Sequence, residues 1–252
     1  MKEERRLVAR FRAARRDPGL VVLEGFHALK HALRFGAAIL EAVTADPALA
    51  ARLAAELAPD LAHRLAGLLQ PVPAASFAEL APQPPETGIL AIARRPAVKR
   101  PAFLEAGTGP LVLLDHPAHA RNLGAAVRVA AAAGAEALLC LGPLDPWHPT
   151  AVRAGAGLQF ALPVARMSEL PESGRPLVAL DPEGDPLEPG RIAGDAVLAF
   201  GSERHGLSAA LLARADRRVR LPMRPGISSL NLATAVAAVL YLLRLCRGEK
   251  RG

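Results

Sequence analysis

The stretch at 196–246 constrains the fold more than any other part of this 252-residue chain. It contains two short apolar runs, one ending at Gly201 and the other at Pro222. A long apolar segment then begins behind Ser229 and Asn231, which are residue types favoured at helix N-termini. This segment is apolar on nearly every side, which predicts a buried helix, and its roughly 16 residues are fewer than a membrane span needs. Two strand ends and a capped helix are therefore expected to present polar groups and bare backbone to one place.

Short apolar runs alternate with helical patterns along the whole chain. In the first part, a basic amphipathic helix over 2–16 precedes a small α/β unit that closes with a strand at 88–93. In the second part the expected strands lie at 111–114, 137–141, near 160–163, 177–180, 197–200 and 219–221. This alternation predicts an α/β fold with a mostly parallel sheet that is covered on both faces. In such sheets ligands bind beyond the carboxyl ends of the strands.

A segment rich in proline, glycine and charge at 94–110 separates the two parts and is typical of a linker. We place the boundary near 105, which predicts an N-terminal domain at 1–105 and a second domain at 106–252.

Three local features add to this outline. Asn122 is positioned to cap a helix that runs to Ala133, with Gly134 at its C-terminus. Cys140 and Cys246 lie in apolar runs and form no C-x-x-C pattern, which predicts reduced core residues. The N-terminal M-K-E-E-R-R is not followed by the apolar region of a signal peptide. We therefore expect a cytoplasmic protein without a membrane segment.

The net charge of +7 and the pI of about 10.4 make a polyanion a plausible partner. Arginine supplies nearly all of the positive charge, and its planar fork suits phosphate contacts. A bias toward arginine and alanine in the coding sequence explains the same composition, so charge alone leaves both interpretations open.

Several chemistries are disfavoured by missing motifs. The chain has no G-x-x-x-x-G-K-[ST] loop, no G-x-G-x-x-G after a strand and no G-x-S-x-G elbow. His27 and His31 are one helical turn apart, but no carboxylate or cysteine completes a metal site. We expect no bound metal.

The remaining polar residues occur in a specific order. An N-x-G-x-x-x-R pattern follows one strand, G-x-E-x-x-G a second, and L-P-M with S-L-N a third. Singly, each residue has an ordinary structural interpretation as a helix cap, a surface charge or a loop residue. Together they define a candidate catalytic set: Asn122, Arg128, Glu203, Ser229 and Asn231.

These three motifs resemble those of the SpoU (TrmH-type) branch of the SPOUT superfamily, RNA ribose 2′-O-methyltransferases. The resemblance covers about 110–246 and includes N-L-G-A-A-V-R, F-G-S-E-R-H-G-L and L-P-M followed by S-L-N. One departure is Gly155, where relatives commonly have serine.

The resemblance implies a fold and a chemistry that composition and periodicity do not show. It implies a deep C-terminal trefoil knot, a homodimer formed near the knot, and S-adenosylmethionine bound there. The cofactor would contact Gly201, Leu221, Met223 and Leu230, largely through backbone groups. Arg128 would act as the base on the ribose hydroxyl or, alternatively, hold a substrate phosphate, with Asn122 and Glu203 orienting it. Ser229 and Asn231 would shape the ribose site.

The N-terminal part is similar to the substrate-binding domain that often precedes this fold, a small α/β unit like a ribosomal large-subunit protein. L-E-G at 23–25 and T-G-I-L-A-I at 87–92 carry this weaker match. We expect this domain to bind RNA through basic residues of the first helix: Arg10, Arg12, Arg15 and Arg16.

Ribosomal RNA is the favoured substrate because of this N-terminal domain, and transfer RNA is the alternative. A non-catalytic RNA-binding or assembly protein with the same fold is a rival interpretation, but it predicts damage to at least one motif. A dinucleotide-dependent enzyme is disfavoured by the missing glycine-rich motif.

Overall fold

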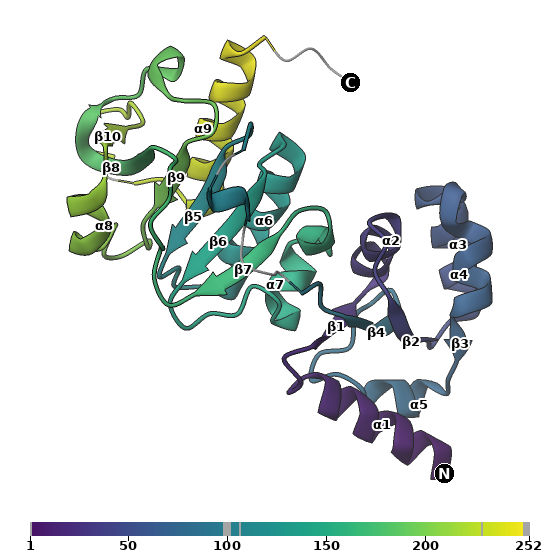
Figure 1. Cartoon of the computed structure of the whole chain (residues 1–252). Helices are drawn as coiled ribbons and strands as arrows, with labels where there is room; N and C mark the ends of the chain where they lie inside the picture. Colours follow the sequence, from purple (N-terminus) through teal and green to yellow (C-terminus); the bar gives the residue numbers. More distant parts are fainter. Residues whose placement is uncertain (1, 98–101, 106, 228, 249–252) are drawn as a thin grey trace. The chain divides into compact units, whose positions relative to one another are not determined.

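The computed structural model describes residues 2–97, 102–105, 107–227 and 229–248. The chain divides into two compact units, the first comprising 1–97 with 147–161 and the second 98–146 with 162–252 (Figure 1). Residues 147–161 therefore belong to the first unit although they lie within the sequence of the second. The predicted boundary after 105 and part of the predicted linker fall on residues outside the described ranges, and the boundary stays a prediction.

The first unit is built on a four-stranded mixed sheet in the order β1-β4-β2-β3. Its strands are β1 (Leu20–Glu24), β2 (Ile39–Thr44), β3 (Gln70–Pro71) and β4 (Ile89–Arg94). The pairs β1–β4 and β4–β2 are antiparallel, and β2–β3 is parallel. The helices of this unit are α1 (Lys2–Ala14), α2 (Phe26–Arg34), α3 (Pro47–Leu57), α4 (Ala62–Leu68), α5 (Ala74–Ala78) and α7 (Pro149–Ala154).

The sequence explains these elements locally. In α1 the apolar positions Val8, Phe11 and Ala14 are spaced at three residues and are buried against β2 and β4. At the start of α3, Asp46 accepts a hydrogen bond from the backbone N–H of Leu49 at 2.9 Å. Proline then occupies the first helical turn, where its missing N–H costs nothing.

The second unit contains a six-stranded sheet in the order β10-β8-β9-β5-β6-β7, and every neighbouring pair is parallel. Its strands are β5 (Leu111–Asp115), β6 (Ala137–Leu141), β7 (Val164–Met167), β8 (Leu177–Pro186), β9 (Val197–Phe200) and β10 (Arg217–Arg220). Its α-helices are α6 (Ala120–Ala133), α8 (Ala209–Arg214) and α9 (Leu232–Cys246). The predicted α/β class with a parallel sheet is confirmed.

Both faces of this sheet are covered. Alternate residues such as Leu113, Leu139 and Ala199 pack with Leu211 of α8 on one face. Their neighbours along the strands, including Val112, are equally buried. In Figure 1, α6 and α9 lie together on the other side of the sheet from α8. Complete burial of both faces explains why the central strands are continuous apolar runs.

Three local predictions are corrected by the structure. Helix α6 begins at Ala120, so Asn122 lies in its first turn and is not its cap, whereas Gly134 ends the helix in the left-handed conformation as predicted. The strand predicted near 160–163 begins only at Val164, because a 3₁₀ turn precedes it. Cys140 is buried, and burial raises the pKa of its thiol to about 12, but Cys246 is exposed.

The last helix is also less buried than predicted. Asn231 caps α9 by accepting hydrogen bonds from the N–H groups of Ala233 and Thr234, at 3.0 and 3.4 Å. One face of α9 is buried, but Tyr241, Leu242 and Leu245 are exposed. None of the described helices is long and apolar enough to cross a membrane.

Candidate active site

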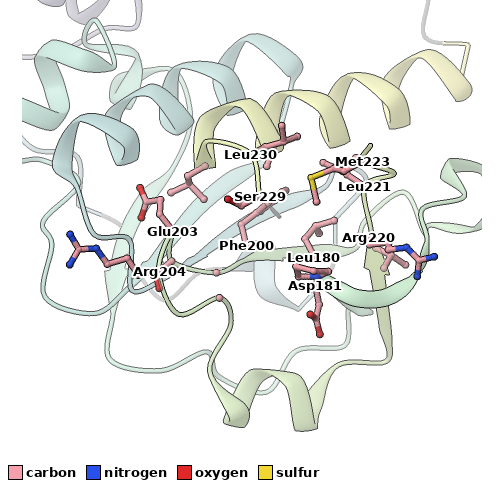
Figure 2. A pocket seen from close by; sticks show the side chains of 17 residues that line it. Leu180, Asp181, Phe200, Glu203, Arg204, Arg220, Leu221, Met223, Ser229 and Leu230 are labelled. Atoms are coloured by element: carbon pink, nitrogen blue, oxygen red, sulfur yellow. The ribbon is translucent and has the colours of Figure 1, made fainter. Parts of the chain in front are cut away.

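A cavity of about 360 Å³ opens where β8, β9 and β10 meet the start of α9. Figure 2 shows Leu221 and Met223 on one side of it and Glu203 on the other, with Phe200 and Ser229 between them. The three strands are neighbours in a parallel sheet, so their carboxyl-terminal parts share one edge. This is the place where such sheets bind ligands.

All four residues predicted to contact a cofactor line this cavity: Gly201, Leu221, Met223 and Leu230. Gly201 is required by a close backbone approach, because a Cβ there would lie 2.0 Å from the carbonyl carbon of Gly206. The turn that begins at Gly201 is closed by two backbone hydrogen bonds of 3.0 Å between Ser202 and Gly206. A larger residue at 201 would open this turn.

A chain of hydrogen bonds connects the three sequence motifs. Asn231 donates from Nδ2 to Oδ1 of Asn122 at 3.2 Å, and Asn122 in turn donates from Nδ2 to Oε1 of Glu203. The other carboxylate oxygen of Glu203 accepts from the backbone N–H of Ala118 at 3.1 Å. We call Asn231, Asn122 and Glu203 the polar relay. It fixes the start of α9 against α6 and the loop after β9.

Glu203 is ionised by its surroundings. Its partial burial alone would raise its pKa, but hydrogen bonds from Asn122, from its own backbone and from Ala118 together lower the pKa below its ordinary value. A carboxylate in this position accepts hydrogen bonds and donates none. Glu203 is therefore suited to holding the neighbouring loop rather than to supplying a proton.

The other two members of the candidate catalytic set lie outside the polar relay. Ser229 lines the cavity. Arg128 is exposed on α6, and it makes no hydrogen bond or ion pair with any residue of the described ranges. The predicted orientation of Arg128 by Asn122 and Glu203 is thus absent from the described contacts, and its guanidinium is free to meet a ligand.

Of the four arginines predicted to bind RNA, Arg10 and Arg12 lie on α1, whereas Arg15 and Arg16 follow it, because the helix ends at Ala14 and not at residue 16. Arg12 and Arg16 are exposed, whereas Arg10 forms an ion pair with Glu41. Arg15 is one-fifth exposed and lies 2.8 Å from the carboxylate of Glu24.

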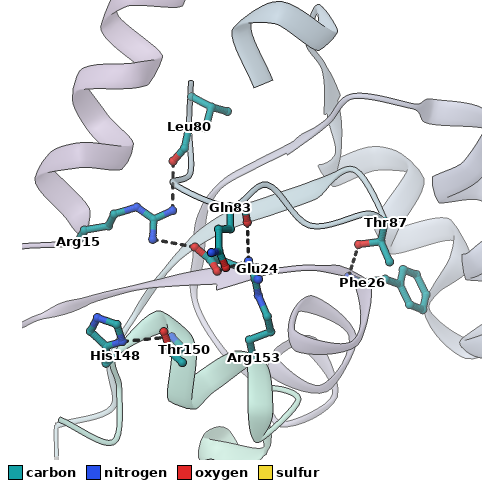
Figure 3. Close-up of polar contacts among 9 residues, drawn as sticks. All are labelled: Arg15, Glu24, Phe26, Leu80, Gln83, Thr87, His148, Thr150 and Arg153. Carbon is teal, nitrogen blue, oxygen red and sulfur yellow. Dashed lines mark hydrogen bonds and ion pairs between the residues drawn. The ribbon is translucent and has the colours of Figure 1, made fainter. Parts of the chain in front are cut away.

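Glu24 is the centre of a network that sequence reasoning missed (Figure 3). Its second oxygen lies 2.5 Å from Nη2 of Arg153 on α7, which also donates to the carbonyl of Gln83 at 2.8 Å. Arg15 donates to the carbonyl of Leu80 at 3.1 Å. The L-E-G sequence that contains Glu24 contributed to the resemblance of the N-terminal part to a substrate-binding domain. Its partner Arg153, however, is 129 residues away. No local pattern could have paired them.

No group of three histidine, cysteine, aspartate or glutamate side chains able to hold a metal occurs among the described residues.

Residues 109–241, more than half of the chain, match the SpoU rRNA Methylase family. The fold agrees, with a parallel six-stranded sheet whose strand ends surround the cavity. This protein therefore belongs to the SpoU rRNA Methylase family.

Two relatives are similar to this chain over part of its length. An uncharacterized tRNA/rRNA methyltransferase of Mycobacterium bovis is 36% identical over 167 residues, 61% of this chain and 58% of the relative. A 23S rRNA (uridine(2479)-2′-O)-methyltransferase of Streptomyces viridochromogenes is 35% identical over 144 residues, 52% of this chain and 50% of the relative. The match thus spans less than two thirds of the length of these relatives.

The structural match is longer. The crystal structure of the SpoU methyltransferase AviRb from Streptomyces viridochromogenes, in complex with AdoMet, superposes with a TM-score of 0.72 at 25% identity. It covers 92% of both chains, so both units of this protein have counterparts there.

Proposed function

We propose that this protein is an S-adenosylmethionine-dependent RNA methyltransferase that methylates a ribose 2′-hydroxyl, with ribosomal RNA as the favoured substrate. The observation that carries the proposal is the cavity at three strand ends, together with the polar relay that joins the three family motifs and whose Glu203 lines the cavity. The names of the relatives support the same reaction.

The cavity fits the proposed cofactor. Its volume of about 360 Å³ lies within the range of small-ligand pockets. Leu221, Met223 and Leu230 offer apolar contacts, and the glycine at 201 leaves backbone groups within reach of a ligand. When bound, S-adenosylmethionine supplies an activated methyl group. The four predicted cofactor residues would hold it.

The side chains of this protein contribute positioning and charge. The polar relay keeps α9 and the loop after β9 in a fixed geometry, which aligns two reactants at low entropic cost. Ser229 at the cavity wall would contact the ribose. The exposed guanidinium of Arg128 carries a positive charge, which favours holding a substrate phosphate over accepting a proton.

The first domain, at 1–105, would bind RNA and the second, at 106–252, would carry the reaction. Arg12 and Arg16 are available for phosphate contacts, while Arg10 and Arg15 contact RNA only if they leave or share their carboxylate partners. With aromatic residues at 4% of the chain, recognition would depend on phosphates, arginine and RNA shape.

Three finer features complete the proposal. The C-terminal part would form a trefoil knot, and the chain would act as a homodimer through the exposed face of α9. The two free cysteines fit the reducing cytoplasm.

Methyl transfer from radiolabelled S-adenosylmethionine to 23S ribosomal RNA and to bulk transfer RNA tests the reaction. We expect label in ribosomal RNA, at a nucleotide whose 3′ linkage becomes resistant to alkaline hydrolysis. Arg128→Ala should lower turnover by about a hundredfold, the order of effect that lost substrate positioning produces. Arg52→Ala, an exposed arginine on α3, serves as the control.

The alternatives give different results in the same assay. Label in transfer RNA alone would support the proposed methyl transfer and contradict the preference for ribosomal RNA. RNA binding without any transfer, in wild-type protein that is folded, would indicate an assembly protein. Wild-type turnover in Arg128→Ala would show that Arg128 has no role in the reaction.

A further inference from the structure

The loops that follow β5 and β9 carry a cluster of exposed basic side chains. These strands are neighbours in the central sheet, so their carboxyl ends lie side by side. We define the rim as five residues of these loops and of the first turn of α6, all of them exposed: His116, His119, Arg121, Arg204 and His205.

The two loops are held together by hydrogen bonds. The carboxylate of Glu203 accepts from the backbone of Ala118, which links the loop after β9 to the loop after β5. Ser202 and Gly206 pair through their backbones, so the residues between them form the tip of a tight turn. The backbones of the two loops are therefore held in place, and the rim side chains project from fixed backbone positions.

His116 has an unusual backbone that its surroundings maintain. Its φ is +49°, a conformation that non-glycine residues rarely adopt. Its Nδ1 lies 2.7 Å from Oδ1 of Asp115, a side chain that is 2% exposed and whose other oxygen accepts from the N–H of Ser208 at 2.7 Å. Because a carboxylate accepts, Nδ1 carries the hydrogen, and Nε2 of the exposed ring is left for a ligand. Such locally strained residues persist where the surrounding structure fixes them, and they cluster at functional sites.

The two arginines of the rim are not paired with the carboxylates that lie beside it, although His116 is paired with Asp115. The acidic residues at 115–122 and 200–208 are Asp115 and Glu203, and both accept hydrogen bonds inside the fold. Arg121 and Arg204 make no ion pair with any described residue. Arg121 also lies in the first turn of α6, where the helix dipole is positive and an acidic residue is usual.

We propose that the rim binds phosphate groups of the RNA strand that enters the cavity, an inference that rests on the proposed function and adds a second RNA contact to it. Arg204 lines the cavity, and its side chain extends outward beside Glu203 (Figure 2). A phosphate held there belongs to a nucleotide next to the one that is methylated. The planar forks of Arg121 and Arg204 suit bidentate phosphate contacts, and the three histidines add donors.

The test measures binding of the full chain to fluorescein-labelled single-stranded oligouridylate between 50 and 200 mM salt, in an anisotropy titration. The double variant Arg121→Gln/Arg204→Gln keeps polar side chains at two exposed positions without ion pairs, so its fold should be unchanged. We expect its affinity to fall by about tenfold, as for a lost charge-assisted contact. The slope of log affinity against log salt should become shallower by about 1 per arginine. His116→Asn, a residue that tolerates positive φ, should weaken binding in the same direction.

Arg52→Gln on α3 is the matched control and should leave both quantities unchanged. Calorimetric titration with S-adenosylmethionine separates the two proposals, because Arg121→Gln and His116→Asn, at residues that do not line the cavity, should bind it as the wild type does. Wild-type affinity and salt slope in both rim variants would overturn the inference while the proposed function stands. A wild-type protein that neither binds the cofactor nor transfers methyl would instead overturn the proposed function.

Discussion

Glu24 shows how one buried carboxylate organises distant parts of the chain. It forms an ion pair with Arg15, which follows α1, and accepts a hydrogen bond from Arg153 on α7, and its own side chain is 7% exposed. Both arginines donate further to backbone carbonyls, so the network joins four segments of the first unit. Its removal would leave two guanidinium groups without their carboxylate.

We predict that Glu24→Gln lowers the free energy of unfolding by about 2 kcal/mol, because charge-assisted hydrogen bonds contribute more than neutral ones. Urea denaturation measures this, with Glu56→Gln on the exposed side of α3 as the control. Equal midpoints for the two variants would mean that the network contributes nothing to stability.

His31 gives the first unit a dependence on pH. Its Nδ1 lies 2.7 Å from the carbonyl of Ala156, so the neutral ring donates there. Burial lowers the pKa of His31 below its ordinary value, although the hydrogen bond to Ala156 opposes this. The unfolded chain therefore binds a proton more readily than the folded one. As pH falls through about 6.5, the unfolded value, stability is lost until the folded pKa is passed.

We predict that this loss is smaller in His31→Gln, whose amide can donate to Ala156 without titrating. The difference in unfolding free energy between wild type and variant should be constant above about pH 7 and should change as the pH falls below about 6.5. Chemical denaturation at several pH values measures it. A constant difference across the whole range would show that His31 does not titrate on unfolding.

At the scale of single residues, the sequence predicted positions better than partners. Gly201, Leu221, Met223 and Leu230, which the family resemblance implied, line the cavity, and the strand ends and helix start beside them are visible in the pattern. Pairing across the fold is not visible. The bond of Asn231 to Asn122 joins residues 109 apart, and no local rule assigns it.

Among the elements, α9 connects stability to the site. Asn231 caps the helix with its side-chain oxygen and donates to Asn122 with its side-chain nitrogen. One side chain therefore has two separable tasks.

We predict that Asn231→Ala loses both tasks, and that the lost cap lowers the free energy of unfolding by about 1 kcal/mol. Asn231→Asp keeps an oxygen for the cap but places a carboxylate against Oδ1 of Asn122, so it should lose methyl transfer with less change in stability. Thermal melting and turnover are measured on the same samples. Full turnover in Asn231→Asp would separate the polar relay from the reaction.

The element that the sequence placed wrongly has a physical explanation. The apolar residues near 160 were expected in a strand, but they form a 3₁₀ turn in which Phe160 packs edge-on against Trp147, with ring centroids 5.1 Å apart. Gly157 precedes this turn at φ +76°, and a Cβ there would lie 2.4 Å from the carbonyl oxygen of Ala28. The apolar residues near 160, whose pattern favours a strand, are thus buried in the first unit as part of a turn.

At the scale of the whole molecule, the alternation of strands and helices predicted the class of fold, because it depends on local periodicity. The assignment of 147–161 to the first compact unit depends on contacts of Arg153, His31 and Gly157, and these are long-range. Sequence order alone therefore could not show it.

The exposed face of α9 carries the last prediction. Helix α9 is apolar on nearly all sides and packs one face mainly against α6, yet Tyr241, Leu242 and Leu245 remain exposed, the last by 76%. Grouped apolar side chains of this kind mark interaction sites, and here they support the proposed homodimer. We predict that Leu245→Glu converts the protein to a monomer, because a charge would have to be buried in the interface.

Light scattering coupled to gel filtration gives the mass of each species. Leu57→Glu on α3 introduces the same charge at another exposed leucine and should leave the dimer intact. If wild type and Leu245→Glu both elute as monomers, the face binds something other than a second copy of this chain. If both are dimers, the interface lies elsewhere, and the exposure of Tyr241 and Leu242 has to be explained by a different partner.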